Sequence, residues 1–187
     1  MLRVILHGCC GTMGKVVSQI AEKSDDIVIT AGIDRQGSAF YPVYRSCSEC
    51  HEEADVIIDF SVAAAADELI DYAGERRLPL VLCTTGLSEE QLRKVEDLTS
   101  KIAVLRSANM SLGVNLLLKL ASQAAPVLAG NGFDIEINDK HHHRKLDAPS
   151  GTALAIADEI NAAVGGDRIY KYDRSVQHAA RDPKEIG

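Results

Sequence analysis

The chain has 187 residues, 46% hydrophobic and 25% charged, with a formal net charge of −7, which is ordinary for a soluble globular protein of one large or two small domains. The acidic balance argues against nucleic acid as a partner. Because no apolar run approaches the roughly 20 residues that span a bilayer, and the N-terminus lacks a signal-peptide pattern, we expect no membrane contact and a cytoplasmic location.

Strands and helices are predicted to alternate through the first hundred residues. Short apolar runs predict strands at 2–7, 27–33, 56–60, 79–83 and 102–105, with helical periodicity after residue 14 and over 61–74 and 89–100. Ser61 is expected to cap the second helix, and Ser88 with Gln91 to form a capping box on the third. This βαβ series predicts an α/β fold with a Rossmann-type doubly wound parallel sheet.

The pattern changes after Ala108, where we place a domain boundary. We expect a long helix over 112–128 stopping near Pro126, a half-exposed strand over 133–139, and a helix from Ser150 to the Gly165-Gly166 pair, before an irregular end. Residues 1–108 then form the nucleotide-binding domain, and 109–187 form a smaller α+β substrate domain.

Five cysteines, an odd number, and the absence of a secretion signal indicate free thiols. Cys47-Ser48-Glu49-Cys50-His51 matches the C-x-x-C-H pattern of haem attachment, but nothing else in the sequence supplies a haem pocket. We favour a solvent-facing loop that holds two thiols, and leave open any role for Cys47, Cys50 and His51.

Glycines 8, 11 and 14 lie between the first predicted strand and helix. Residues without side-chain bulk let backbone N–H groups and the helix N-terminus face a pyrophosphate. Cys10 stands where G-x-G-x-x-G has its second glycine, so this turn alone is a weak signal of dinucleotide binding.

Asp34 strengthens that interpretation, because it ends the second strand 20 residues after Gly14, where an acid would accept hydrogen bonds from the ribose hydroxyls. Arg35 could instead meet a 2′-phosphate, so the sequence favours neither NADH nor NADPH. The loops after the fourth and fifth strands, Thr84-Thr85-Gly86 and 107–110, would line the same crevice, or be ordinary turns.

Residues 139–153, DKHHHRKLDAPSGTA, concentrate titratable groups. An extended segment would place Asp139, His141 and His143 on one side and alternate residues on the other. A zinc site lacks an evident third ligand beside repelling cations, and we expect no metal. Ser150 as N-cap, with Gly151 and Thr152 in the first helical turn, would instead make an anion site suited to a dicarboxylate, with proton donors nearby.

Five segments together carry a resemblance to a known family: HGCCGTMG at 7–14, DFS at 59–61, CTTG at 83–86, SANMSLGVN at 107–115 and HHHRKLDAPSGTA at 141–153. The chain resembles the 4-hydroxy-tetrahydrodipicolinate reductase (dihydrodipicolinate reductase) family. The resemblance implies reduction of a cyclic dicarboxylate by NADH or NADPH in the diaminopimelate route of lysine biosynthesis, by a homotetramer.

The resemblance also implies roles for individual residues. His141 and Lys145 correspond to the catalytic proton donors, with the choice between them open. His142 corresponds to a substrate-binding residue, and Gly151 and Thr152 to the site for a substrate carboxylate. The implied cofactor contacts are Gly8, Cys9, Cys10, Gly11, Thr12, Met13, Asp34, Arg35, Cys83, Thr84, Thr85, Ser107, Ala108, Asn109 and Met110.

The sequence departs from the family pattern in two places. Cys83 stands where a glycine is usual, and the sequence stops at Gly187, where family members continue into further strands of the substrate domain. We therefore expect a truncated reductase with weakened catalysis and tetramer assembly. The alternatives are a non-catalytic NAD(P)-binding fragment and another Rossmann oxidoreductase acting on an amino or keto acid.

Overall fold

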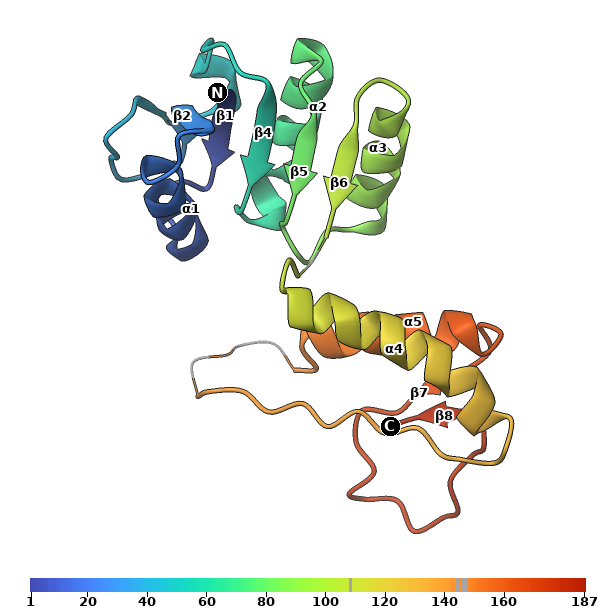
Figure 1. Cartoon of the computed structure of the whole chain (residues 1–187). Helices are drawn as coiled ribbons and strands as arrows, with labels where there is room; N and C mark the ends of the chain where they lie inside the picture. The colour runs from blue at the N-terminus through green and yellow to red at the C-terminus, as the bar shows by residue number, and fades with distance from the viewer. Residues whose placement is uncertain (108, 144, 146–147) are drawn as a thin grey trace. The chain divides into compact units, whose positions relative to one another are not determined.

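The computed structural model describes residues 1–107, 109–143, 145 and 148–187, in two compact units, Met1–Ala108 and Asn109–Gly187 (Figure 1). The first unit is built on six parallel strands in the order β3-β2-β1-β4-β5-β6. This arrangement confirms the Rossmann-type α/β class. The strands are β1 (Leu2–His7), β2 (Ile27–Ile33), β3 (Val43–Tyr44), β4 (Val56–Asp59), β5 (Leu80–Leu82) and β6 (Val104–Arg106).

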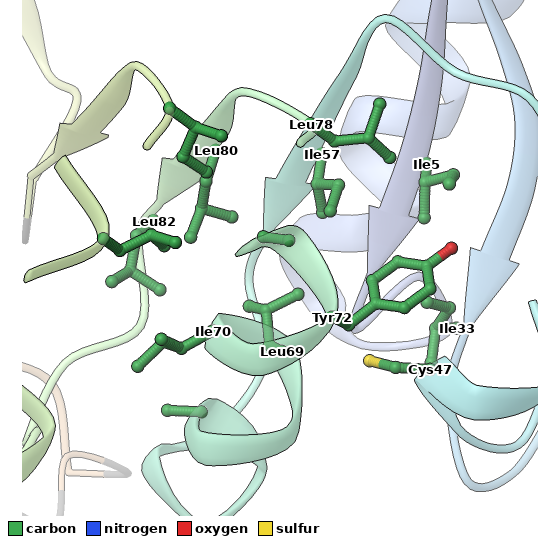
Figure 2. Packing of buried hydrophobic residues seen from close by; sticks show 14 of the residues in the cluster. Ile5, Ile33, Cys47, Ile57, Leu69, Ile70, Tyr72, Leu78, Leu80 and Leu82 are labelled. Carbon is green, nitrogen blue, oxygen red and sulfur yellow. The ribbon is translucent and has the colours of Figure 1, made fainter. Parts of the chain in front are cut away.

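Helices α1 (Thr12–Glu22), α2 (Ala66–Arg76) and α3 (Glu89–Thr99) connect successive strands. Side chains of a strand alternate between faces, so β1 contributes to two separate cores. Val4 and Leu6 pack with residues of α1, whereas Ile5 packs in a larger cluster with α2 and α3. Figure 2 shows that larger cluster, in which Leu69 and Tyr72 of α2 lie among the leucines and isoleucines of the sheet.

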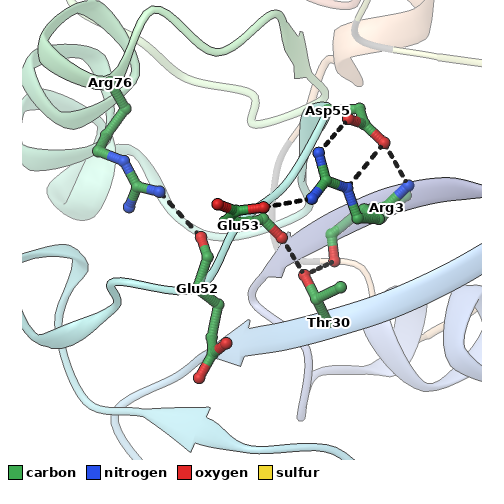
Figure 3. Close-up of polar contacts among 7 residues, drawn as sticks. Arg3, Thr30, Glu52, Glu53, Asp55 and Arg76 are labelled. Carbon is green, nitrogen blue, oxygen red and sulfur yellow. Dashed lines mark hydrogen bonds and ion pairs between the residues drawn. The ribbon is translucent and has the colours of Figure 1, made fainter.

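Polar contacts hold the segment before β4 against the sheet (Figure 3). The Arg3 guanidinium donates to Glu53 and Asp55, and the Asp55 carboxylate also accepts from the Arg3 backbone N–H at 2.8 Å. The Thr30 hydroxyl donates to the carbonyl of Glu53, and Arg76 of α2 donates to that of Glu52. These contacts fix where β4 enters the sheet beside β1.

The expectation of a solvent-facing loop at Cys47 and Cys50 is wrong. Both are buried, at 1% and 0% exposure, in a 3₁₀ turn (Cys47–Glu49) that follows β3. The turn packs against α2: the Cys47 N–H donates to Glu68, and the Tyr72 hydroxyl donates to the carbonyl of Cys50. A sequence pattern of mixed polarity does not reveal such packing, because only the thiols turn inward.

Capping expectations have mixed outcomes. The Ser88–Gln91 capping box is present on α3. Ser61 does not cap α2, because a 3₁₀ turn (Ala63–Ala65) separates them and Ala65 occupies the N-cap position. The Ser61 backbone N–H instead donates to Asp59, at the end of β4.

The second unit packs α4 (Leu112–Ala129) against α5 (Gly151–Ala163). Its short parallel strands are β7 (Ile169–Tyr170) and β8 (Glu185–Ile186), so the predicted irregular end contains strands. The predicted 133–139 strand is wrong as a full strand, because it forms a single bridge, Ile135 to Ile186. The predicted end of α4 near Pro126 and the Gly130–Gly132 turn agrees with the structure, in which Pro126 lies in the last turn and Gly130 is the C-cap.

Among the described helices, α4 is long and apolar enough to cross a membrane. It has 18 residues with a mean hydropathy of 1.4, and 6% of these residues are buried. The expectation from the sequence concerned continuous apolar runs, and polar residues interrupt α4 well before such a length is reached. Polar residues such as Asn115 and Lys119 separate the apolar residues of α4, although the mean hydropathy of the helix stays at 1.4. Length and composition alone are weak evidence, and α4 packs on α5 through Ala121 and Ala125.

Asp55→Asn should destabilise the first unit in a pH-dependent way. Hydrogen bonds from Arg3 hold the pKa of the Asp55 carboxyl at about 2, below its ordinary 3.8. Because the folded pKa is the lower one, this stabilisation is complete above 3.8 and is lost as the pH falls toward 2. The free energy of unfolding in urea, measured by hydrogen exchange of the β1 amides, should be lower for the variant than for the parent. This difference should shrink as the pH falls from 3.8 toward 2.

Glu53→Gln is the matched control, because the Glu53 side chain is 84% exposed and an exposed ion pair contributes little. A gap of equal size for Glu53→Gln, or one that does not depend on pH for Asp55→Asn, would contradict the assignment.

Candidate active site

The carboxyl ends of β1, β4 and β5 meet at the Asp59 carboxylate, which is fully buried. His7 Nδ1 lies 2.8 Å from its Oδ1, and the Thr84 hydroxyl donates to its Oδ2 at 2.6 Å. Burial raises the pKa of Asp59, but the hydrogen bonds from His7, Ser61 and Thr84 outweigh burial and hold that pKa below its ordinary value. The carboxyl ends of these strands are therefore held together by a charged carboxylate whose two oxygens both accept hydrogen bonds.

The glycine turn directly follows β1 in the chain and leads into α1. Gly8 has φ +76°, and a Cβ there would come 2.7 Å from the Phe60 carbonyl oxygen. A Cβ on Gly14 would come 2.3 Å from the Gly8 carbonyl oxygen. Gly11 is the N-cap of α1, and its backbone N–H donates to the Gly8 carbonyl oxygen at 3.1 Å. Close backbone approach therefore requires glycine at positions 8 and 14.

Asp34 lies beside this turn. Its Oδ2 accepts from the Cys10 backbone N–H at 2.9 Å and its Oδ1 from the Gln36 N–H at 3.3 Å. Asp34 is half-buried, and the neighbouring Arg35 is exposed. The structure thus brings together the glycine turn and the acid that follows β2, although they are separated in sequence.

The predicted cofactor loops have different environments. Thr84 and Cys83 are buried, and burial raises the pKa of the Cys83 thiol to about 11, whereas Thr85 is exposed. The Ser107 N–H donates to the Leu82 carbonyl at the edge of the sheet. Ala108 lies outside the described residues.

Asn109 and Met110 belong to the second unit. The Asn109 side-chain amide donates to the Thr152 hydroxyl at 3.1 Å, and its Oδ1 accepts from the Ser111 N–H at 2.8 Å. Asn109 is therefore placed at the N-terminus of α5 within its own unit.

A cavity of about 500 Å³ in the second unit collects the titratable groups of the basic segment. His141, His142 and Lys145 line it together. The expectation that His142 points away from His141 is wrong, because the chain turns at His143, where the Lys145 N–H donates to the His142 carbonyl. The other lining residues are mainly apolar or aromatic: Ile137, Ala148, Pro149, Ala153, Leu154, Ala157, Tyr170, Tyr172, Ile186 and Gly187, with Asp139.

Asp139 is a residue that the sequence analysis placed on the same side as His141 without giving it a role in the site. Its Oδ1 lies 2.7 Å from His141 Nε2, and its Oδ2 accepts from the Ser150 backbone N–H. Hydrogen bonding from Ser150, with the charge of His141, lowers the pKa of the Asp139 carboxyl. The carboxylate therefore orients the imidazole, as the Asp-x-His spacing in an extended segment permits.

The N-terminus of α5 borders the same cavity. As expected, Ser150 is the N-cap, and its hydroxyl accepts from the Ala153 N–H at 3.0 Å. Gly151 and Thr152 occupy the first turn, between the lining residues Pro149 and Ala153, but do not line the cavity themselves. Free N–H groups and the helix dipole make this end favourable for an anion.

Comparison with known proteins decides the family. The family model for the N-terminus of dihydrodipicolinate reductase matches residues 2–110, and the model for its C-terminus matches residues 113–187. The chain belongs to the dihydrodipicolinate reductase family of oxidoreductases.

Curated relatives agree with this assignment. The chain is 50% identical to the 4-hydroxy-tetrahydrodipicolinate reductase of Caldanaerobacter subterraneus subsp. tengcongensis, and 41% identical to that of Clostridium botulinum. Both alignments cover 100% of this chain and 74% of the relative. The reductase function expected from the sequence is confirmed.

Solved structures show the same fold. A dihydrodipicolinate reductase from Paenisporosarcina sp. TG-14, solved with dipicolinate bound, matches with a TM-score of 0.76 at 24% identity, over 100% of this chain and 77% of that one. An NAD-binding protein from Listeria innocua matches with a TM-score of 0.54 at 16% identity, over 72% and 43% of the two chains.

Gly14→Ala should impair nucleotide binding by the reductase. The new Cβ would clash with the Gly8 carbonyl at 2.3 Å, so the turn and α1 must separate. We expect at least about a tenfold loss of cofactor affinity, since overpacking costs about 1–3 kcal/mol. Fluorescence titration with NADH and NADPH measures it.

Gly113→Ala in α4 is the control, because the nearest atom to its Cβ is 3.9 Å away. Unchanged affinity in Gly14→Ala would contradict a requirement for close approach at this turn.

Proposed function

We propose that this chain reduces 4-hydroxy-tetrahydrodipicolinate to tetrahydrodipicolinate with NADH or NADPH, in the diaminopimelate route of lysine biosynthesis. In this proposal the first unit binds the nucleotide and the second binds the substrate. The single observation that carries the residue roles is the convergence of His141, His142 and Lys145 on one cavity beside the N-terminus of α5.

The cavity suits a cyclic dicarboxylate. One carboxylate would be held by the Gly151 and Thr152 backbone at the first turn of α5, where the helix dipole favours negative charge. His142 would bind the substrate from the opposite wall. Apolar lining residues such as Ile137 and Leu154 would cover the ring. A reductase with this fold has been solved with dipicolinate, a ligand of the same class.

Two groups are placed to deliver a proton. Asp139 engages His141 Nε2, so exchange with the substrate would use Nδ1, and the carboxylate would stabilise the protonated imidazole. Lys145 would place an ammonium beside the substrate, where it can supply the proton that accompanies the hydride as the 4-hydroxyl leaves as water. We propose Lys145 as the direct donor and His141 as the group that shares or replaces its proton. A positioned acid of this kind accelerates a reaction about 10²–10⁴-fold.

The first unit fits a nicotinamide dinucleotide. Gly8 and Gly14 leave space that a Cβ would fill, and Gly11 is the N-cap of α1, so the backbone N–H groups of Thr12 and Met13 in its first turn would face the pyrophosphate. When bound, the nicotinamide supplies the hydride. The residues that follow β5 and β6, Cys83–Thr85 and Ser107–Met110, are proposed to line its other end.

Assembly and location follow from the same proposal. We propose a cytoplasmic location without nucleic-acid or membrane partners, and weakened assembly of this chain into the homotetramer that the family resemblance implies. Exposed leucines of α4, among them Leu116 and Leu120 at 53% each, support burial of this helix against a further surface. Light scattering of the purified chain tests the tetramer.

Lys145→Ala should lower turnover about 10²–10⁴-fold while changing cofactor affinity little, because the proton donor acts on substrate alone. The assay is oxidation of NADPH coupled to freshly made substrate, with cofactor affinity measured separately by titration. Lys140→Gln removes a neighbouring cation that does not line the cavity and should retain normal turnover. Equal losses in both variants would show that general charge, not a proton donor at Lys145, accounts for the effect.

Substitutions of Asp34 and Arg35 should affect the KM values for NADH and NADPH differently. Asp34→Ala should raise the KM for NADH, since the ribose hydroxyls lose an acceptor, and should spare NADPH, whose 2′-phosphate it repels. Arg35→Ala should raise the KM for NADPH and leave that for NADH nearly unchanged. Steady-state kinetics with each cofactor measure both. A parallel change for the two cofactors in either variant would contradict this division of roles.

A further inference from the structure

The two cysteines of the glycine turn lie next to Asp34 and carry thiol groups that the proposed hydrogen bonds to the nucleotide do not use. The Cys9 and Cys10 sulfurs are 3.7 Å apart, and with an Asp34 carboxylate oxygen they all lie within 4.8 Å of one another. Cys9 is 2% exposed, while Cys10 and Asp34 are half-buried, so the cluster opens toward solvent on one side.

The surrounding glycines leave room for both sulfurs. A Cβ on Gly32 would come 2.5 Å from the Cys9 sulfur, and a Cβ on Gly37 would come 2.6 Å from the Cys10 sulfur. The positions of the two thiols are therefore fixed by close packing against the backbone of β2 and of the segment that follows it.

Oxidative chemistry does not suit this pair. Neighbouring residues have Cα atoms about 3.8 Å apart, shorter than the roughly 4.4–6.8 Å of ordinary disulfides, so a Cys9–Cys10 disulfide would be strained.

Metal coordination does suit it. Tetrahedral zinc with Zn–S bonds of about 2.3 Å separates two sulfurs by about 3.8 Å, close to the spacing found here. Two thiolates and one carboxylate are a donor set that zinc accepts, with the fourth position left for water. We propose that Cys9, Cys10 and Asp34 form a binding site for a thiophilic divalent cation of the zinc class.

Metal and nucleotide exclude one another at this site. An Asp34 carboxylate that coordinates zinc no longer accepts from a ribose, and zinc binding displaces the two thiol protons, so the net charge of the site is unchanged. This exclusion rests on the proposed cofactor role of Asp34, whereas metal binding itself does not. The site thus makes the reductase sensitive to free zinc through competition with its cofactor.

Cobalt(II) is the probe for the site, because tetrahedral thiolate coordination gives it visible ligand-field bands and a near-ultraviolet charge-transfer band. The reduced full chain, titrated without nucleotide, should develop these bands with one equivalent of cobalt and lose them on addition of zinc. Cys9→Ser and Cys10→Ser should each abolish the bands. Cys47→Ser and Cys50→Ser remove thiols elsewhere in the same unit and should retain them.

Absence of the bands in the parent chain, or their persistence in a Cys9→Ser/Cys10→Ser double variant with native circular dichroism, would overturn the site. One equivalent of zinc should also weaken NADH binding at least about tenfold in the parent but not in Cys10→Ser. Unchanged NADH affinity with zinc bound would overturn the exclusion. NADH titration without metal tests the proposed cofactor site independently.

Discussion

A buried carboxylate at the end of β4 is the constraint on which the first unit depends. Asp59 receives contacts from β1 through His7 and from the residue after β5 through Thr84, and its pKa stays low despite full burial. A buried charge is tolerated only when hydrogen bonds satisfy it, so the ends of three strands must meet at this point. The glycine turn after β1 is held at that meeting point, where a Cβ on Gly8 would strike the backbone of Phe60.

The two units solve the problem of binding anions by the same physical means. In each, a helix begins beside a polar residue whose position is fixed: α1 at Gly11 with Asp34 nearby, and α5 at Ser150 with Asp139. The unpaired N–H groups of a first turn attract negative charge. The units differ in what surrounds that turn, since the first offers glycines and thiols, and the second histidines and a lysine.

The thiols show how one turn can carry two chemistries. Cysteine at position 10 replaces a glycine of the usual dinucleotide pattern, yet Gly32 and Gly37 accommodate the sulfurs. A substitution that weakens the sequence signal for nucleotide binding therefore produces a compact cluster of soft ligands. The proposed zinc site and the proposed cofactor site share Asp34, which is why competition between them is expected.

The sequence by itself determined the class of fold, the glycine turn, the capping of α3 and α5, and the family, because these depend on periodicity and on residues close together in the chain. It misjudged Ser61, the 133–139 strand and the burial of Cys47 and Cys50, where a partner distant in sequence decides the outcome. Only the tertiary structure joined Asp59 to Thr84, placed His142 in the same cavity as His141, and brought Cys10 to Asp34. These contacts follow from strand order and from local turns, and neither is encoded in the polarity of neighbouring residues.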